Sequence, residues 1–402
     1  MSKVIVVGGG ASGLVASIFA SKNNDVVVLE KNSKCAKKIL VTGNGKCNYW
    51  NSDFTKDHFN FSDSTWINSI ITKENKEEIM NFFDSIGIIP NIKNGYYYPM
   101  SNQAISINTS LIKEAELRGV NIITDTEVLN VSYDKKYIIE TSNGVYEADK
   151  LIISTGSHAY IQDKCIGYNI LRKFNHKINP VLPALVQLES HGSFLKKWAG
   201  VRIDAELSLY ENNKLISNSS GEVQLTDYGI SGICTFQLSS LVSIGLYNNK
   251  KECIHINFMP YLKDNFIDFM NDRNKKVNSR TISELLDGLF NYKLSNTILE
   301  LCNIKLDDKW DCIDNSKKEM LAKKITDFKI DITGTKGYKN AQTCTGGVDI
   351  KEINPKTMES LIKKDLYITG EIIDVDGQCG GYNLGFAFLT GMIAGRGVND
   401  KN

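Results

Sequence analysis

The sequence predicts an α/β fold: a Rossmann-type domain with a parallel sheet, interrupted by an inserted antiparallel β-domain and a small helical domain. Three observations support this prediction. A buried strand runs into a glycine fingerprint at the N-terminus, and a second strand, glycine-rich turn and helix follow residue 365. Between them the hydrophobic pattern changes to short alternating strands and then to short helices.

The N-terminal fingerprint lies in the context that dinucleotide binding requires. Lys3–Val7 is a β-branched run typical of a buried parallel strand. It leads into Gly8-Gly9-Gly10-Ala11-Ser12-Gly13 and a helix of small and apolar residues, and a second strand, Val26–Leu29, ends at Glu30. This order of strand, G-x-G-x-x-G, helix, strand and acid predicts a dinucleotide site.

Each position of the fingerprint has a chemical reason. Gly8 permits the tight turn, Gly10 lets the backbone approach a pyrophosphate, and Gly13 lets the helix lie close to the strand. The helix N-terminus offers N–H groups to phosphates. Glu30 can accept a hydrogen bond from a ribose 2′-OH and would repel a 2′-phosphate, so FAD or NAD is favoured over NADP. A glycine-rich structural turn is the competing interpretation.

Length and composition exclude several classes of protein. A chain of 402 residues has room for two or three domains, and 42% hydrophobic with 23% charged residues is ordinary for a globular protein. The net charge of +1 gives no support for a nucleic-acid or membrane partner. A strand beginning at residue 3 argues against a signal peptide, and no apolar run would span a bilayer. The nine cysteines lack C-x-x-C spacing, so we expect reduced thiols, no metal site and a cytoplasmic protein.

The region after the second strand has few apolar residues. Residues 31–50 include Gly43-Asn44-Gly45 and predict either a loop that wraps a cofactor or an ordinary solvated turn. Helical spacing then predicts helices at 66–72, 76–86 and 104–118. Between the last two, Tyr96-Tyr97-Tyr98-Pro99 predicts a strand against the core, with a pocket lining as the alternative.

Alternating residues then predict strands. A strand at 120–123 precedes a three-stranded meander, and the buried strand 150–154 returns to the central sheet. Its end, Thr155-Gly156, is expected near the cofactor. The strands of the meander are expected at 127–131, 137–141 and 145–148.

From Leu185 onward the pattern indicates insertions. Antiparallel strands are expected at 186–188, 201–210, 214–218 and 222–225, followed by helices at 233–242, 266–270, 282–290, 294–302 and 319–325. The predicted domains are 1–184 with 328–402 for the cofactor, 185–260 for the β-domain and 261–327 for the helical domain.

The C-terminal part again resembles a cofactor site. Strand 366–369 ends at Gly370-Glu371, the glycine-rich turn 374–383 follows, and a helix is expected at 384–394. This arrangement aims a second helix N-terminus at a ligand, and the acid can hold a polyol hydroxyl such as the ribityl chain of FAD. Because the chain has no second fingerprint, we expect one bound FAD and no separate NAD(P)H domain.

Several stretches, taken in order, resemble the BaiN/YhiN-type flavoproteins, the aminoacetone-oxidase-like FAD-binding family, over nearly the whole chain. They are the fingerprint, Lys38-Ile39-Leu40-Val41-Thr42-Gly43-Asn44-Gly45-Lys46-Cys47-Asn48, Pro183-Ala184-Leu185-Val186, Tyr228-Gly229-Ile230-Ser231-Gly232, Thr357-Met358-Glu359-Ser360 and Gly370-Glu371 through Asn383. The resemblance implies a glutathione-reductase-like FAD-binding domain built from both chain ends, with a β-barrel-like and a helical domain over the flavin.

The resemblance also implies the cofactor-binding residues. The ADP half would be held by the fingerprint and Glu30, the flavin side by the 43–48 loop, and the ribityl chain and ring by the C-terminal turn. The full set is Gly8, Gly10, Ala11, Ser12, Gly13, Glu30, Lys31, Lys38, Gly43, Asn44, Gly45, Lys46, Asn48, Val128, Thr155, Gly156, Gly370, Glu371, Asp374, Gly381, Tyr382 and Asn383. Four positions depart from the common pattern, with Asn44 for Gly, Lys46 for Arg, Cys344 for Thr and Tyr96 for Arg.

The resemblance implies an FAD-dependent oxidoreductase that moves hydride between flavin N5 and a small organic substrate. One reading is an NAD(P)H-dependent reductase of a conjugated C=C bond in a steroid- or bile-acid-like enone. Another is an oxidase of an aminoacetone-like amine that releases hydrogen peroxide. Readings from other classes are an FAD-containing RNA-associated protein and a flavin-binding protein without turnover.

The sequence assigns no catalytic acid or base. Helix dipoles could lower the thiol pKa of Cys47 or Cys379, although buried fillers are the simpler interpretation. His158 follows the Thr155-Gly156 turn and either faces the flavin or is structural. A proton donor for enone reduction would be a Tyr or a Cys. The acids of the C-terminal turn favour flavin hydroxyls or turn capping over a metal.

Overall fold

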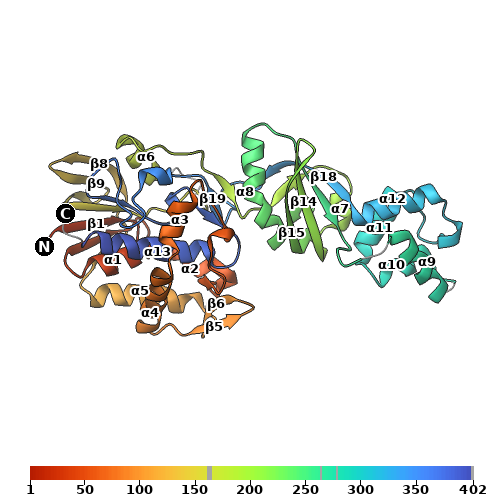
Figure 1. Ribbon diagram of the computed structural model, residues 1–402, viewed down its shortest axis with the longest axis horizontal. Coiled ribbons are helices and arrows are strands. Elements are labelled where there is room, and N and C mark those ends of the chain that lie inside the picture. The colour runs from red at the N-terminus through yellow and green to blue at the C-terminus, as the bar shows by residue number, and fades with distance from the viewer. Residues whose placement is uncertain (161–164, 263–264, 278, 400–402) are drawn as a thin grey trace. The chain divides into compact units, whose positions relative to one another are not determined.

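The computed structural model describes residues 1–160, 165–262, 265–277 and 279–399 (Figure 1). The chain forms two compact units. Unit 1 comprises Met1–Val181 and Thr343–Asn402, and unit 2 comprises Leu182–Gln342. Each unit has its own hydrophobic core.

Unit 1 is built on a five-stranded parallel sheet with the strand order β20-β11-β1-β2-β7. Its strands are rich in Val, Ile and Leu because helices or strands cover both faces. The strands are β1 (Lys3–Val7), β2 (Asp25–Leu29), β7 (Asn121–Ile123), β11 (Lys150–Ile153) and β20 (Leu366–Ile368).

Smaller sheets complete unit 1. The antiparallel meander contains β8 (Val128–Asp134), β9 (Lys136–Thr141) and β10 (Gly144–Ala148). A second sheet contains β3 (Trp50–Asn51), β6 (Tyr96–Pro99) and β5 (Pro90–Lys93), and a third contains β4 (Phe59–Asn60) and β21 (Asp376–Gly377). Strand β19 covers Thr343–Thr345.

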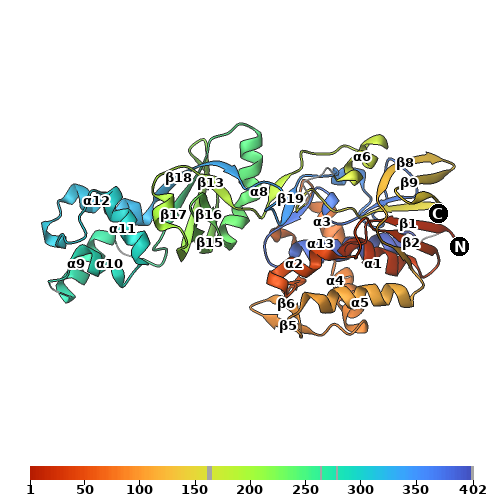
Figure 2. The same cartoon turned by 180° about the vertical axis from the view of Figure 1, so that it is seen from behind.

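Helices α1 (Ala11–Ala20) and α13 (Tyr382–Gly397) lie side by side in unit 1 (Figures 1 and 2). Their closeness depends on glycine. A Cβ at Gly391 would lie 2.4 Å from Ser12 O, and one at Gly395 would lie 2.6 Å from Ala16 O. The other helices of unit 1 are α2 (Lys37–Val41), α3 (Ser64–Ile70), α4 (Lys73–Ser85), α5 (Ala104–Leu117) and α6 (Ile166–Lys173).

Unit 2 contains a closed barrel with the strand order β13-β16-β15-β14-β17-β18, best seen in Figure 2. Its strands are β13 (Leu188–Ser190), β14 (Arg202–Glu211), β15 (Lys214–Leu225), β16 (Gly229–Ser231), β17 (Glu252–Asn257) and β18 (Phe328–Thr335). The unit also contains β12 (Leu182–Ala184), α7 (Leu195–Trp198), α8 (Ile233–Tyr247), α9 (Phe266–Lys276), α10 (Ile282–Asp287), α11 (Tyr292–Leu301) and α12 (Asn315–Thr326). No helix of the described part of the chain is both long and apolar enough to cross a membrane.

The predicted fold class is confirmed, and several boundaries differ. Lys37–Val41 forms a short helix inside the segment expected to be a loop. The two strands expected at 214–218 and 222–225 are one strand, β15, and β17 was not anticipated.

The sequence assigned 328–402 to the cofactor domain, but β18 pairs with β17 and β13 and belongs to the barrel. The chain returns to unit 1 at Thr343. The alternating burial of β18 is the half-buried pattern of a barrel strand. Chain order alone could not assign that strand to a sheet.

Candidate functional site

Packing requires glycine at two positions of the fingerprint turn, Gly8 and Gly13, whereas the space beside the third, Gly10, is open. Gly8 has φ +103°, and a Cβ there would lie 2.6 Å from Ser154 O. A Cβ at Gly13 would lie 1.9 Å from Gly8 O, whereas one at Gly10 would meet no atom within 4 Å. No side chain caps the N-terminus of α1 at Gly10. The helix therefore presents its first N–H groups to open space, which fits a pyrophosphate.

Glu30 lies beside this turn and is only 6% exposed. Its Oε2 accepts a hydrogen bond from Gly9 N at 2.8 Å, and its Oε1 accepts from Asn32 N at 2.8 Å and Asn32 Nδ2 at 2.6 Å. A carboxylate offers about four acceptor sites. The acid thus holds the turn in place and retains acceptor capacity for a ribose hydroxyl.

The N-terminus of α13 is a second uncapped helix end. Gly381 precedes it with φ +91°, and a Cβ there would lie 2.6 Å from Trp50 O. The two contacts of Gly391 with Ser12 and Gly395 with Ala16 show that α13 and α1 run in the same direction. Gly391, which lies beside Ser12, is nine residues after the start of α13, whereas Ser12 is one residue after the start of α1. At about 1.5 Å per residue, the N-terminus of α13 therefore lies roughly 12 Å before that of α1 along their shared direction. This offset suits an extended dinucleotide with its phosphates at one helix end and its ring near the other.

Glu371 lies at the centre of a polar cluster. It pairs with Lys38 Nζ at 2.5 Å, and its Oε1 accepts hydrogen bonds from Ser157 Oγ at 2.5 Å and Thr343 Oγ1 at 3.0 Å. The neighbouring Gly370 has φ +76°, and a Cβ there would lie 2.5 Å from Ser12 Oγ. The cluster therefore joins the predicted Gly370-Glu371 element to the fingerprint helix and to the segment after Thr155-Gly156.

The 43–48 loop is open to solvent at four of the predicted positions. Gly43, Asn44, Gly45 and Lys46 are exposed, and Gly43 and Asn44 both have φ near +54°. Asn48 faces inward instead. With its amide nitrogen turned toward them, it donates to Trp50 O at 3.0 Å and Tyr97 O at 3.2 Å. Asn48 therefore holds the loop against β3 and β6.

The remaining predicted residues have different roles in the structure. Asn383 bonds Gly377 twice, donating to its carbonyl at 2.7 Å and accepting from its N–H at 2.9 Å, so it holds the C-terminal turn. Asp374 accepts from Asn179 Nδ2 at 2.7 Å, and burial raises the pKa of its carboxyl.

Three further predicted side chains lie outside these clusters. The Tyr382 ring stacks on His58 at 4.5 Å. Val128 is buried at the start of β8, and Lys31 is exposed beside Glu30.

Sequence reasoning missed two polar residues of this region. Ser157 and Thr343 bond Glu371, as described above. Asp376, one of the acids of the C-terminal turn, is 2% exposed, accepts from Asn60 Nδ2 at 2.9 Å and lies beside the Thr345 hydroxyl. Burial raises the pKa of Asp376 to about 7. The position of Ser157 directly after the Thr155-Gly156 turn was the available signal for one of them.

The two cysteines fit the simpler of the two interpretations, that of buried fillers, and the alternative of a lowered thiol pKa is wrong. Burial raises the thiol pKa of Cys47 and of Cys379 to about 12, so both are neutral thiols at physiological pH. The Nδ1 atom of His158 accepts a hydrogen bond from Cys165 N at 3.1 Å, and its ring contacts Tyr168 at 5.2 Å. These contacts give His158 a structural role. Among the described residues, no group of His, Cys, Asp or Glu is arranged to hold a metal ion.

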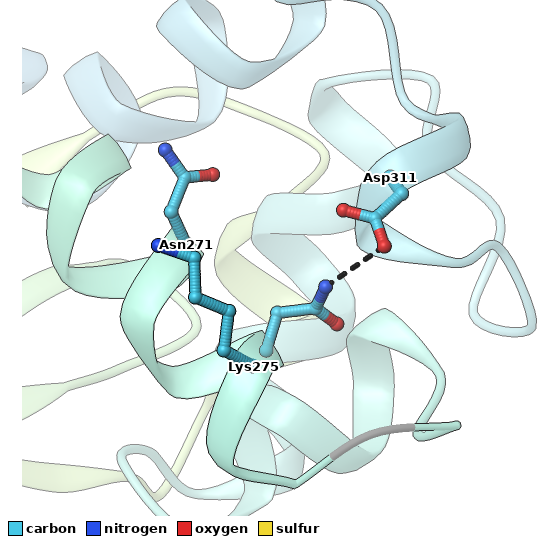
Figure 3. A pocket seen from close by; sticks show the side chains of 4 residues that line it. Asn271, Lys275 and Asp311 are labelled. Atoms are coloured by element: carbon cyan, nitrogen blue, oxygen red, sulfur yellow. Dashed lines mark hydrogen bonds between the residues drawn. The ribbon is translucent and has the colours of Figure 1, made fainter.

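A separate depression lies on the helical part of unit 2 (Figure 3). Its cavity of about 450 Å³ is lined by Asn271, Asn274, Lys275 and Asp311, and Asn274 Nδ2 donates to Asp311 Oδ2 at 3.0 Å. All four lining side chains are polar. The depression contains none of the nucleotide-binding elements.

Known proteins resemble this chain over nearly its whole length. The model of the family described as HI0933-like protein Rossmann domain matches residues 2–397. The chain belongs to this family.

One curated relative is the 3-dehydro-bile acid delta(4,6)-reductase of Clostridium scindens, 34% identical over 408 residues and covering 100% of both chains. Another is the ribosomal RNA dihydrouridine synthase of Escherichia coli, 26% identical and covering 96% of this chain and 95% of that protein.

Among solved structures, a 3-ketosteroid-delta4-(5alpha)-dehydrogenase from Rhodococcus jostii RHA1 matches with a TM-score of 0.50 and 14% identity. The match covers 100% of this chain and 97% of the other, and at this identity it concerns the fold.

These findings make the protein an FAD-dependent oxidoreductase. The open face at Gly10, the two uncapped helix ends and the Glu371 cluster fit FAD. The packing also supports this assignment. A Cβ at Gly391 or Gly395 would prevent the close approach of α13 to α1, and these two helices provide the uncapped ends.

Proposed function

We propose that the protein uses NAD(P)H and FAD to reduce a C=C bond conjugated to a carbonyl in a steroid- or bile-acid-like substrate. The observation that carries this proposal is the 34% identity, over the full length of both chains, with a reductase of 3-dehydro-bile acids. A rigid polycyclic enone also accords with the net charge of only +1, because the chain offers no large excess of cations for a polyanion.

Bound FAD would supply the hydride chemistry. The residues of the chain bind and orient it. The α1 N-terminus and Glu30 would hold the ADP half, and Glu371, kept in place by Lys38 and Ser157, would accept hydrogen bonds from the ribityl hydroxyls. The uncapped N-terminus of α13 would stabilise negative charge on the ring as it is reduced.

The test is an anaerobic experiment in two halves. NADH or NADPH is added to the FAD-loaded protein, and bleaching of the flavin spectrum is followed. A 3-oxo steroid with a conjugated 4,6-diene is then added, and the return of the oxidised spectrum is followed with mass spectrometry of the product. We expect reoxidation by the steroid and a product heavier by two hydrogens. Bleaching by an aminoketone, with peroxide released in air, would instead support the amine oxidase reading.

A second candidate function is reduction of a uridine in ribosomal RNA, favoured by the full-length similarity to a ribosomal RNA dihydrouridine synthase. That reaction also adds two hydrogens across a C=C bond conjugated to a carbonyl. The identity is lower than for the bile-acid reductase, and basic and acidic residues are nearly balanced across 182–342. Incubation of the reduced protein with unmodified ribosomal RNA, followed by mass mapping of the nucleosides, distinguishes the two candidates.

A further inference from the structure

Strand β6 places two tyrosines on one face and a third on the other. Residues two apart on a strand share a face, so Tyr96 and Tyr98 lie together and Tyr97 is opposed to them. Tyr97 packs edge-on against the buried Tyr49, with ring centroids 6.2 Å apart. Tyr97 therefore belongs to the core, and the other two rings face a different environment.

The Tyr96 and Tyr98 rings touch both glycine loops assigned to the flavin side. A Cβ at Gly380, in the C-terminal turn, would lie 3.1 Å from Tyr96 Cε1. A Cβ at Gly43, in the N-terminal loop, would lie 3.6 Å from Tyr98 Cε1. Both positions are glycines, so neither loop presents a side chain there. Their positive φ values, +138° at Gly380 and +54° at Gly43, disfavour any residue with a Cβ. One of the two neighbouring phenol rings of β6 thus lies against each loop.

The hydroxyls of these phenols are available to a ligand. Neither makes a hydrogen bond to any residue of the described ranges, and both side chains are partly exposed. The buried Tyr137 contrasts with them, because its hydroxyl donates to Lys364 O at 2.6 Å. Burial, followed by the nearby Tyr96, raises the pKa of Tyr98, so its phenol carries a proton at neutral pH.

We propose that Tyr98 donates a proton to the carbonyl oxygen of the enone, with Tyr96 as a second hydrogen-bond donor to the same oxygen. The proposal rests on the proposed function. It extends that function because it names the proton donor that enone reduction requires and that the sequence left unassigned.

The step balances as follows. Two electrons and one hydrogen reach the far carbon of the conjugated system as a hydride from the flavin, which NAD(P)H has reduced. The π electrons move toward the carbonyl oxygen, and the O–H bond of Tyr98 breaks as a new O–H bond forms on the substrate. The resulting enol returns to the ketone in water, and the phenolate takes a proton from water. The net change in the substrate is the addition of two hydrogens.

The experiment compares Tyr98→Phe and Tyr96→Phe with Tyr97→Phe, the matched control on the opposite face of the same strand. The first readout needs no turnover. A 3-oxo-4,6-diene steroid is bound to the oxidised holoprotein, and its own absorption band is recorded. A hydrogen bond to the carbonyl shifts that band to longer wavelength. We expect the shift in the wild-type protein and in Tyr97→Phe, a reduced shift in Tyr96→Phe, and its loss in Tyr98→Phe.

The second readout is the rate at which the steroid reoxidises the reduced flavin in a single turnover. A general acid contributes about 10²–10⁴-fold, so Tyr98→Phe should slow this step by that factor. Flavin content and the rate of reduction by NAD(P)H should stay at the wild-type level, which would exclude a folding defect.

The two proposals fail in different ways. If the wild-type protein reduces the steroid while Tyr98→Phe and Tyr96→Phe retain both the band shift and the rate, the tyrosine assignment is wrong. If the wild-type protein neither binds nor reduces any enone, the proposed function is wrong as well.

Discussion

Glu252 provides a quantitative test of how the barrel is built. It lies on β17, is 4% exposed, and its Oε1 has no hydrogen-bond partner in the described part of the chain. A Cβ at Gly245 of α8 would lie 1.7 Å from that oxygen, so the helix rests on the carboxyl group. Glu211 stands opposite it on β14 and is itself paired with Lys250 at 2.6 Å.

Burial and, secondarily, the charge of Glu211 raise the pKa of Glu252 from 4.5 to about 7. The folded protein therefore keeps a proton that the unfolded chain releases above its own pKa of 4.5. Stability is greatest below that pKa and falls as the pH rises toward 7, above which the loss is complete. At about 1.4 kcal/mol per pKa unit, the full loss is roughly 3 kcal/mol.

The perturbation is Glu252→Gln, which keeps the shape and cannot ionise. We expect it to match the wild-type protein at about pH 4 and to unfold with a free energy up to roughly 3 kcal/mol higher at about pH 8. Hydrogen exchange of peptides from β17 and α8 reports the opening of unit 2 separately from unit 1. Glu222→Gln is the control, because Glu222 makes an exposed pair with Arg202 at 2.7 Å. An effect of Glu252→Gln that is equal at both pH values would refute the reasoning.

Two further predictions concern the cofactor. Gly10→Ala should leave the thermal stability of the apoprotein unchanged, because its Cβ meets no atom within 4 Å, yet it should weaken FAD binding at least about tenfold. Gly13→Ala should lower both the thermal stability and the FAD affinity, because its Cβ would lie 1.9 Å from Gly8 O. Thermal melts and FAD titrations check this pair, and a Gly10→Ala protein with normal FAD affinity would argue against phosphate binding at that turn. Lys38→Met removes the cation paired with Glu371 and should weaken FAD binding by about tenfold. Because the Lys38 side chain is 39% exposed, the free energy of unfolding of the apoprotein should change by less than about 1 kcal/mol. Equal FAD affinity in titrations of the variant and wild type would contradict a role for this pair in the site.

The short-range patterns were sufficient for most elements of unit 1. Val4–Val7 and Val26–Leu29 are apolar on both faces, and a buried parallel strand is the element that such a run best satisfies. Gly8 and Gly13 of the fingerprint are required by packing, whereas the space beside Gly10 is open and is left for a ligand. The family resemblance then extended this reading to the C-terminal turn.

Other features depend on which segments meet in space. No strand was predicted at Phe328–Thr335, and the pairing of β18 with β17 and β13 assigns this segment to the barrel. For Cys47 and Cys379, sequence reasoning left two alternatives, a thiol pKa lowered by a helix dipole or a buried filler, with the filler as the simpler one. Desolvation at Cys47 and Cys379 has the opposite sign and is larger, and it depends on packing from residues far along the chain.

The sequence by itself determined the cofactor class and the order of most elements of unit 1, because the fingerprint, its acid and the strand periodicity are local properties. Tertiary structure decided which polar groups converge. Lys38, Ser157, Thr343 and Glu371 come from four separate segments and meet only when both chain ends join one sheet. The direction in which Tyr96 and Tyr98 face was decided in the same way, by the pairing of β6 with β3 and β5. Convergence of this kind is a property of the packed chain, and no spacing along the sequence encodes it.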